Sequence, residues 1–294
     1  MPSLTLNSPA KLNLVLDILR KRADGYHEVE FVMQELELHD VVTIETIPNS
    51  TAIMIQCTDE NVPADSRNTC WKAAQLMQKE FQLQNKKMQG VKISIEKNIP
   101  SAGGLGGGSS NAATVLKALN SLWGLNLSKE KLAEMGAQIG SDVPFFIYGL
   151  TCVARGRGEL ITSIEKLSQK LELAFIVPPI KVPQEKTKWI YGSFNVENVK
   201  VHPSVKDFRE AMKSNDAKII ASRMGNAFDY LQLKEYAPVF DLIHSLKPLP
   251  SIYNVILAGA GPTICVVCEN ERIASQVIAP FKMQGWQAFT TKTV

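Results

Sequence analysis

The sequence predicts an α+β fold, in which strands and helices form more than one layer. Three observations support this class. Residues 28–47 and 91–99 are extended and alternate between apolar and polar side chains, as strands do. Apolar residues at helical spacing follow directly, from Ser110 to Trp123. From about residue 160 a new series of strand and helix patterns begins, which predicts a second structural unit.

The elements of the first unit follow from local pattern and from capping residues. Residues 3–18 alternate and predict strands that are interrupted at Pro9. Either Ser66 or Asn68 is expected to cap a helix over residues 69–81, and Ser128 is expected to cap a further helix. One face of the first strand region should carry five leucines: Leu4, Leu6, Leu12, Leu14 and Leu16.

The second unit begins with an apolar strand over residues 171–179. The later part of the chain contains another strand, ICVVCE, and a last strand near the C-terminus. We place the boundary at residue 158, so that the two predicted units are 1–158 and 159–294. Helical patterns in the second unit cover residues 204–213, 216–230, 234–246 and 270–283.

Composition excludes several classes of function. The 294 residues carry 32 Lys and Arg against 29 Asp and Glu, a net charge of +3 without any dense basic run, so we expect no nucleic-acid partner. No apolar run is long enough to cross a bilayer, and the first residues do not resemble a signal peptide, so we expect no membrane partner.

Five scattered cysteines argue against a disulfide framework and favour a reducing compartment. We expect the cytoplasm of a bacterium, or the plastid stroma if a transit peptide is missing from this chain. Cys265 and Cys268 form a CxxC, but they lie in the β-branched run TICVVCE. That context predicts a structural strand in preference to a redox or zinc site.

A glycine-rich loop, IPSAGGLGGGSS at 99–110, joins a predicted strand to a predicted helix. The first turn of a helix leaves backbone N–H groups unpaired, and glycines allow an anion to approach them closely. No Gly-Lys-Ser/Thr follows, so this is not a Walker A loop, and the glycine spacing does not match the dinucleotide pattern GxGxxG. The alternative is a flexible linker, but the flanking strand and helix leave no room for one. We therefore predict a phosphate-binding loop.

Two other segments contain polar residues in unusual positions. Lys11 and Asn13 interrupt an apolar strand region, where they could equally belong to an exposed edge. Tyr26 and His27 follow a turn, DG, and would ordinarily be surface residues, although an aromatic ring beside a histidine could stack on a base and pair with its edge. Asp142 precedes a proline and an apolar run, so it could cap a short helix or face a cation such as Lys11.

Through three groups of motifs taken together, the chain resembles members of the GHMP kinase superfamily. The motifs are PAKLNLVLDILRKRADGYHEVE at the start, IPSAGGLGGGSSNAATVLKALN with GAQIGSDVPFFIYG and ARGRGE in the middle, and LAGAGPTICVV near the end. DGYH together with GSDVPFF is typical of the branch that acts on a cytidine-diphosphate-linked methylerythritol. The third motif usually has serines where this chain has alanines, in AGAGPT at 258–263. We expect this loop to be lined by backbone and to close on the substrate or on the phosphate loop.

The resemblance implies two domains: an ATP-binding and catalytic domain over 1–158, with a ribosomal-protein-S5-like arrangement, and a ferredoxin-like α/β domain over 159–294. It implies that the γ-phosphoryl group of ATP passes to the 2-hydroxyl of the methylerythritol moiety, with Mg²⁺ as cofactor, in non-mevalonate isoprenoid biosynthesis. No metal ligand can be assigned from the motifs.

The same resemblance assigns roles to individual residues. It implies that Lys11 and Asp142 are the catalytic pair. Asn13 would lie near the accepting end of the substrate, and Tyr26 and His27 would recognise the cytosine. The other substrate-binding residues would be Tyr191, as a second stacking aromatic, with Gly259 and Gly261. The ATP-binding residues would be Pro100, Ser101, Ala102, Gly103, Gly104, Leu105, Gly106, Gly107, Gly108, Ser109 and Ser110, with Asn68 near the adenine.

Three alternatives remain at this point. Another GHMP kinase, of homoserine or mevalonate type, would keep the glycine loop but would not need Tyr26 and His27. A non-catalytic nucleotide-binding protein would not need both Lys11 and Asp142. An RNA-binding module is disfavoured by the near-neutral charge and by the absence of a basic–aromatic stripe.

Overall fold

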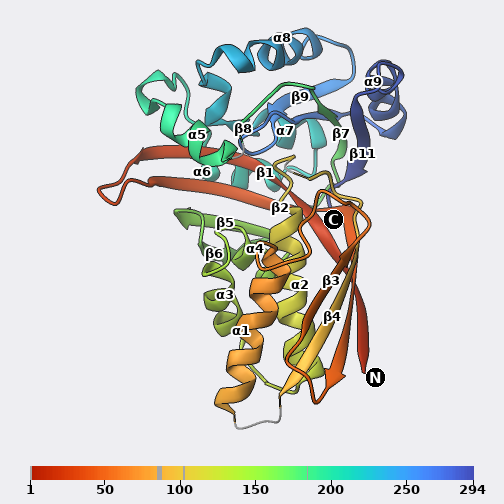
Figure 1. Ribbon diagram of the computed structural model, residues 1–294. Coiled ribbons are helices and arrows are strands. Elements are labelled where there is room, and N and C mark those ends of the chain that lie inside the picture. The colour runs from red at the N-terminus through yellow and green to blue at the C-terminus, as the bar shows by residue number, and fades with distance from the viewer. Residues whose placement is uncertain (1, 85–87, 102, 184) are drawn as a thin grey trace.

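The computed structural model describes residues 2–84, 88–101, 103–183 and 185–294, and two sheets organise this part of the chain (Figure 1). The first sheet has the strand order β3-β4-β2-β1-β8, with β5 paired to β2 and β6 paired to β5. Its strands are β1 (Ser3–Lys21), β2 (His27–Pro48), β3 (Ile53–Cys57), β4 (Gln89–Glu96), β5 (Thr151–Gly156), β6 (Leu160–Ser163) and β8 (Gly225–Asn226). The α+β class is confirmed.

The second sheet is antiparallel and has the order β11-β7-β10-β9. Its strands are β7 (Glu172–Val177), β9 (Ile252–Leu257), β10 (Ile264–Cys268) and β11 (Gln287–Lys292). The chain ends beside the first sheet, where Thr293 forms a bridge with Leu36 of β2. The C-terminus therefore lies at the junction of the two sheets, as Figure 1 shows.

Helices cover both sheets. Against the first sheet lie α1 (Thr69–Leu83), α2 (Gly107–Leu122), α3 (Lys129–Ala137) and α4 (Val143–Tyr148). The second half of the chain contains α5 (Lys186–Ser193), α6 (Val205–Met212), α7 (Ala217–Ser222), α8 (Ala237–Leu246) and α9 (Glu271–Met283). Short 3₁₀ turns lie at Val196–Asn198, Ala227–Tyr230 and Lys234–Tyr236.

The β1–β2 hairpin connects the two halves of the molecule. In Figure 1 it extends between the helices of the first half and α5 and α6 of the second. Two strands that follow residue 158 pair within the first sheet: β6 pairs with β5, and β8 pairs in parallel with β1. The division into 1–158 and 159–294 stays a prediction, since the first sheet takes strands from both sides of that point.

Strand β1 differs from its prediction in a way that matters for the site. It is continuous through Pro9, and its pairing with β2 shifts register between Pro9 and Lys11 and again between Asn13 and Val15. A bulge of this kind reverses which face the following side chains occupy. Leu16 consequently packs in a different apolar cluster from Leu12 and Leu14, so the expectation of one shared leucine face was wrong.

Two helix predictions also need correction, and one helix was missed. Helix α2 begins at Gly107, three residues before the expected Ser110, because the glycines themselves form its first turn. The helix expected over 216–230 ends at Ser222, and the chain then supplies β8 and a 3₁₀ turn. Helix α5 was not predicted, because its weakly patterned sequence buries only Ile190 fully.

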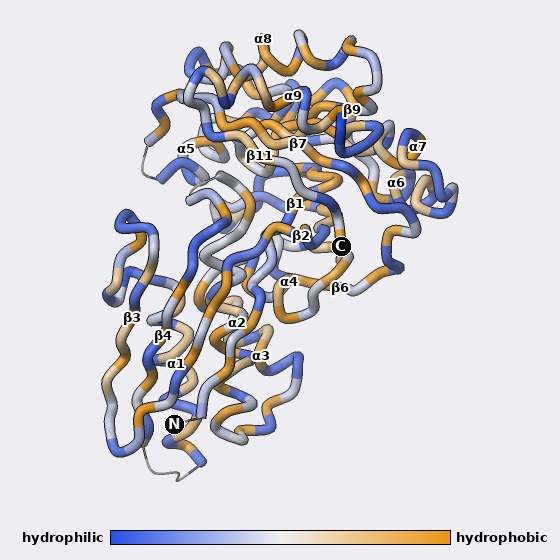
Figure 2. Tube along the Cα trace, turned by 90° about the vertical axis from the view of Figure 1, so that its right-hand side faces the viewer, coloured by the Kyte–Doolittle hydropathy of each residue, from blue (hydrophilic) through white to orange (hydrophobic). Residues whose placement is uncertain are grey.

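The second sheet contains strongly apolar strands, orange beneath α8 and α9 in Figure 2, and β10 is buried along its whole length. Cys265 and Cys268 lie in β10, on opposite faces, and both are buried free thiols. Burial, with a smaller effect of Glu172, raises the pKa of Cys268 to about 12. The CxxC is thus a pair of core residues in a strand, as its sequence context predicted.

Candidate active site

The glycine loop forms the start of helix α2. Gly106 occupies the N-cap position with a left-handed φ of 74°, and no side chain caps the helix. The backbone N–H groups of the first turn are therefore not satisfied by a capping side chain, as an anion site at a helix start requires. A cavity of about 370 Å³ opens over this turn. Its lining includes Asn68, Pro100, Ser101, Gly103–Gly108 and Ser109.

A buried ion pair fixes the entry to the loop. Asp40, which is fully buried, accepts hydrogen bonds from the backbone N–H groups of Asn98 and Ile99 at 2.7 and 2.8 Å. Lys97 pairs with the same carboxylate at 2.9 Å and also donates to the Ile99 carbonyl. A buried carboxylate that is held by three donors orders the backbone around it. Asp40 and Lys97 thus hold the chain where strand β4 passes into the loop.

The loop also packs against the third motif, AGAGPT. Gly104 has a φ of 80°, and a Cβ at this position would lie 2.4 Å from the Ala258 carbonyl oxygen. In return, a Cβ on Gly259 would lie 3.3 Å from the Gly104 carbonyl oxygen. The two loops therefore meet backbone to backbone, and glycine is required at Gly104 by both conformation and space. The expectation that AGAGPT closes on the phosphate loop is confirmed.

Lys11 and Asp142 meet beside this loop. Lys11 Nζ lies 3.5 Å from Asp142 Oδ2 and donates a hydrogen bond of 2.8 Å to Asn13 Oδ1. Asp142 occupies the N-cap position of α4, but its carboxylate makes no capping hydrogen bond. The lysine is buried and the aspartate is about one-third exposed, so the carboxylate can be reached from a cavity while its partner is shielded. The exposed-edge alternative for Lys11 and Asn13 was wrong, since both side chains are buried.

Backbone contacts place this pair on the phosphate loop. The Lys11 N–H donates to the Leu105 carbonyl at 2.9 Å, and a Cβ on Gly106 would meet the Lys11 side chain at 3.0 Å. A second cavity, of about 140 Å³, lies at this point. It is lined by residues of every predicted group: Lys11, Asn13, Gly104, Gly106, Asp142, Tyr191 and Gly259. Gly104 and Gly106 line both cavities and therefore join them.

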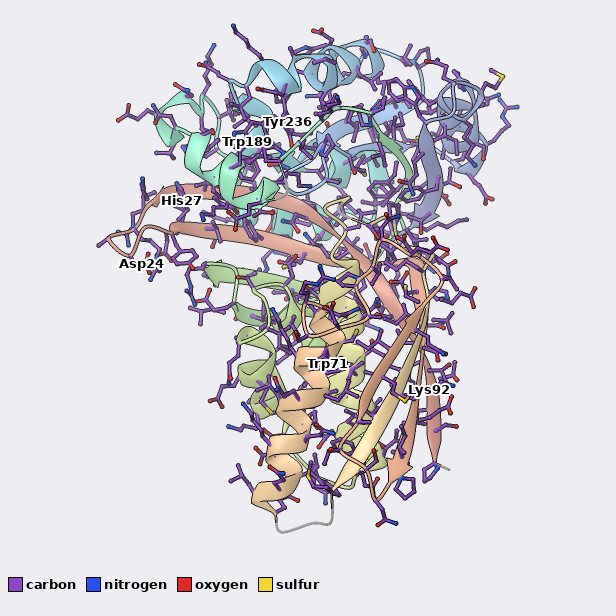
Figure 3. All side chains as sticks on the ribbon, viewed as in Figure 1. Asp24, His27, Trp71, Lys92, Trp189 and Tyr236 are labelled. Carbon is purple, nitrogen blue, oxygen red and sulfur yellow. The ribbon has the colours of Figure 1, made fainter. Side chains whose placement is uncertain are left out.

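Aromatic residues, Tyr191 and Phe228, line part of the smaller cavity, and His27 lies next to Tyr191. The His27 and Tyr191 rings are 5.3 Å apart at 40°, and Tyr191 packs edge-on against the buried Phe228. Figure 3 shows His27 on the β1–β2 hairpin, close to helix α5 with Trp189, and the same helix carries Tyr191. Burial, and to a smaller extent Lys21, lowers the pKa of His27. A neutral imidazole has one donor nitrogen and one acceptor nitrogen, the combination that a base edge requires.

Tyr26 lies apart from these rings. Its side chain is 56% exposed, and the guanidinium of Arg157, from the ARGRGE motif, lies 4.8 Å from its ring centre. Neither Tyr26 nor His27 lines either cavity directly. The stacking role of Tyr26 therefore stays a prediction, and the structure places the histidine nearer to the cavity than the tyrosine.

Other predicted residues have structural partners of their own. Asn68 caps α1: its side chain accepts from the Cys70 N–H and donates to the Pro63 carbonyl. Ser110 is fully buried and accepts a hydrogen bond from Ser8. Gly261 contributes its carbonyl, which accepts from Lys186. Ala102 lies outside the described residues.

Three residues of the site escaped the sequence reasoning. Lys97 and Lys186 each line a cavity, and Asn226 holds the third motif by donating to the Leu257 and Gly259 carbonyls at 2.9 and 2.7 Å. For Lys97 a signal existed, since it directly precedes the glycine loop. Lys186 and Asn226 gave none, because only the folded chain brings α5 and β8 against β1.

Metal ligands are not provided by a preformed cluster. Across residues 2–84, 88–101, 103–183 and 185–294, no group of three or more His, Cys, Asp or Glu side chains could hold a metal ion. Asn111 Oδ1 is buried without a hydrogen-bond partner among the described atoms, and Asn111 lines the larger cavity.

The described helices include none that is long and apolar enough to span a membrane.

Comparison with known proteins agrees with this geometry. Residues 68–150 match the model of the GHMP kinases N terminal domain. A 4-diphosphocytidyl-2-C-methyl-D-erythritol kinase of Geobacillus thermodenitrificans (strain NG80-2) is 41% identical over 268 residues, which cover 91% of this chain and 89% of the relative.

Solved structures extend the comparison to the fold. A crystal structure of 4-(cytidine 5'-diphospho)-2C-methyl-D-erythritol kinase superposes with a TM-score of 0.77 at 25% identity and covers 99% of both chains. A homoserine kinase from Cytophaga hutchinsonii ATCC 33406 reaches a TM-score of 0.69 at 15% identity, covering 100% of this chain and 95% of its own, which shows the fold alone. The chain belongs to the 4-diphosphocytidyl-2-C-methyl-D-erythritol kinase family of the GHMP kinases.

Proposed function

We propose that the protein transfers the γ-phosphoryl group of ATP to the 2-hydroxyl of 4-diphosphocytidyl-2-C-methyl-D-erythritol, which gives the 2-phosphate and ADP. The observation that supports this most directly is the small cavity, where the phosphate loop, the Lys11–Asp142 pair and Tyr191 meet. A phosphoryl donor, an acceptor hydroxyl and a base could be bound there together, as transfer requires. The expected setting is a bacterial cytoplasm.

Asp142 is the proposed general base. Its carboxylate is accessible from the cavity and makes no capping hydrogen bond, so it is able to accept the proton of the acceptor hydroxyl. Lys11 pairs with this carboxylate at 3.5 Å and offsets negative charge as the phosphoryl group moves. Asn13 holds the Lys11 ammonium in place through its side-chain oxygen.

The phosphate groups of ATP fit the start of α2. The N–H groups of the first turn, which no side chain caps, and the helix dipole favour anionic oxygens there. Mg²⁺ bound with ATP would supply charge neutralisation, and such an ion commonly takes few protein ligands. The Ser109 hydroxyl and Asn111 Oδ1 would fit such an ion, since both residues line the larger cavity, whereas Ser110 is buried against Ser8.

Recognition of cytosine is the part that separates this substrate from those of other GHMP kinases. His27 is proposed to pair with the base edge, and Tyr191 and Tyr26 to stack on its faces. The His27–Tyr191 proximity supports this assignment. A homoserine or mevalonate acceptor would leave these aromatic groups without a function.

A substrate panel tests the proposal. ADP release is measured with ATP–Mg²⁺ and, in turn, the cytidine-diphosphate-linked methylerythritol, homoserine and mevalonate. Turnover with the first acceptor alone is expected. Comparable turnover with homoserine or mevalonate would overturn the substrate assignment, and ATP binding without ADP release for any acceptor would favour the non-catalytic alternative.

A further inference from the structure

A second lysine lines the catalytic cavity. Lys186 is the first residue of helix α5, and the cavity that it lines also contains Lys11, Asp142 and Tyr191. Its Nζ donates to the carbonyl of Gly261 in the AGAGPT loop. The side chain is partly buried, and its ammonium group is fixed at the cavity wall by a loop that itself packs on the phosphate loop.

The charges around this cavity favour an additional anion. Among the described residues, its lining contains two ammonium groups, on Lys11 and Lys186, and one carboxylate, on Asp142, so that its net charge is positive. Burial, and then repulsion by Lys11, lowers the pKa of Lys186 to about 8. An anion between the two amines would reduce that repulsion and would stabilise the charged form of Lys186.

The position of Lys186 in the cavity identifies the anion. In the substrate proposed above, a diphosphate joins the cytidine to the methylerythritol. If the base lies against Tyr191 and the hydroxyl lies against Asp142, the diphosphate must cross the cavity that Lys186 lines. We propose that Lys186 binds the diphosphate of the acceptor substrate and thereby selects a nucleoside diphosphate over a neutral acceptor. This inference rests on the proposed function.

The phosphates of ATP are the competing ligand. The lining of the two cavities argues against ATP as the ligand of Lys186. We place ATP in the larger cavity, over the first turn of α2, and Lys186 does not line that cavity. Lys186 instead shares its helix with Tyr191, the aromatic residue on the base side. The Gly261 carbonyl, which accepts from Lys186, belongs to the loop that closes this cavity, so this contact holds the amine on the acceptor side.

Binding of CDP and of cytidine to the full-length protein tests this proposal by calorimetry. The wild type should bind CDP at least about tenfold more tightly than cytidine, the effect of one hydrogen bond to a charged group. Lys186→Met should abolish that preference while the affinity for cytidine stays unchanged, and Lys186→Arg should restore most of it. Lys188→Met is the matched control, since Lys188 is an exposed lysine of the same helix, and should bind like wild type.

The pH dependence provides a second readout. The preference for CDP should fall as pH rises above about 8, because the Lys186 amine then loses its proton, and Lys186→Met should lack this fall. The other titratable groups that face this amine are Lys11 from β1, Asp142 before α4 and Tyr191 on its own helix, and all three remain in the variant.

Each contrary result has a distinct meaning. Equal losses of CDP and cytidine affinity in Lys186→Met would indicate a structural role and overturn the inference. A Lys186→Met variant whose only kinetic defect is a raised KM for ATP would place the lysine on the donor side and would also overturn it. A wild type that binds neither cytidine nor CDP would instead overturn the proposed function. If the wild type binds cytidine and CDP alike, the proposed function survives and the diphosphate contact does not.

Discussion

The two cavities of the site are built in different ways. The donor side, over the start of α2, is lined mainly by the glycine loop, at residues 100, 101 and 103–109. The acceptor side is assembled from side chains of β1, the start of α4 and helix α5, together with the AGAGPT loop. Backbone amides serve any polyphosphate, whereas a particular acceptor needs particular side chains. GHMP kinases with different acceptors should therefore differ mainly on the second side.

Loss of the proposed base, on the acceptor side, should have the largest effect on turnover. We expect Asp142→Asn to lower kcat by roughly 10²–10⁴-fold, the usual contribution of a positioned general base, while ATP binds as before. Steady-state kinetics and calorimetry with ATP measure the two quantities. Glu134→Gln, an exposed carboxylate on α3, is the control. Near-normal turnover of Asp142→Asn would refute the assignment.

A backbone change at Gly104 tests the donor side. The Cβ of Gly104→Ala would meet the Ala258 carbonyl, which should displace the phosphate loop and lower kcat/KM for ATP by about 10²-fold. Gly285→Ala is a matched control, because Gly285 has a similar φ of 77° with nothing within 4 Å of its added Cβ. It should lose only about 1–2 kcal/mol of stability, from the backbone strain alone.

If Gly104→Ala and Gly285→Ala had equal kinetics, the contact between the two loops would not matter for catalysis. Stability is measured by urea unfolding for both variants, so that a folding defect is separated from a kinetic one.

Removal of the histidine should affect the acceptor side alone. We expect His27→Ala to raise the KM for the cytidine substrate about tenfold, the equivalent of one hydrogen bond, and to leave the KM for ATP unchanged. Because burial lowers the pKa of His27, the wild-type KM should stay constant near neutral pH and rise only in acid, where the imidazole gains its proton. His244→Ala, at an exposed histidine of α8, is the control. An unchanged KM in His27→Ala would remove His27 from the recognition of cytosine.

A smaller effect, on stability and not on catalysis, is expected at Asp229, which lines neither cavity. Burial raises the pKa of Asp229 to about 6, with Lys247 and the Leu257 N–H opposing the rise. A carboxyl whose pKa is raised by folding stabilises the folded state in acid, and this contribution is lost as pH rises from about 4 to 6. Asp229→Asn should therefore be more stable than wild type by about 1–2 kcal/mol above pH 6 and should not differ below pH 4.

Urea unfolding of Asp229→Asn as a function of pH measures that difference, and kcat should not change. A variant that is less stable than wild type at pH 7 would show that the charged carboxylate is stabilising, contrary to the direction of its pKa shift.

The contrast between the two sides also explains what could be predicted from the sequence. The phosphate loop is local, so its glycines, the preceding strand and the following helix predicted its place directly. Lys11, Asp142 and His27 followed from the resemblance of their motifs, but their meeting depends on the bulges of β1, which no local pattern shows. Lys186 and Asn226 were not predicted at all. Their function depends on α5 and β8 packing against the first sheet, a long-range contact between two halves of the chain.

Phosphorus NMR of the product tests the central claim most directly. The account predicts one new phosphomonoester signal without proton coupling, because the 2-carbon is tertiary and carries no hydrogen, beside an unchanged diphosphate. A signal that is split by neighbouring protons would place the phosphoryl group on another hydroxyl, and loss of the diphosphate signal would show cleavage instead of transfer. Either result would contradict an acceptor that is held by its cytidine end and phosphorylated beside Asp142.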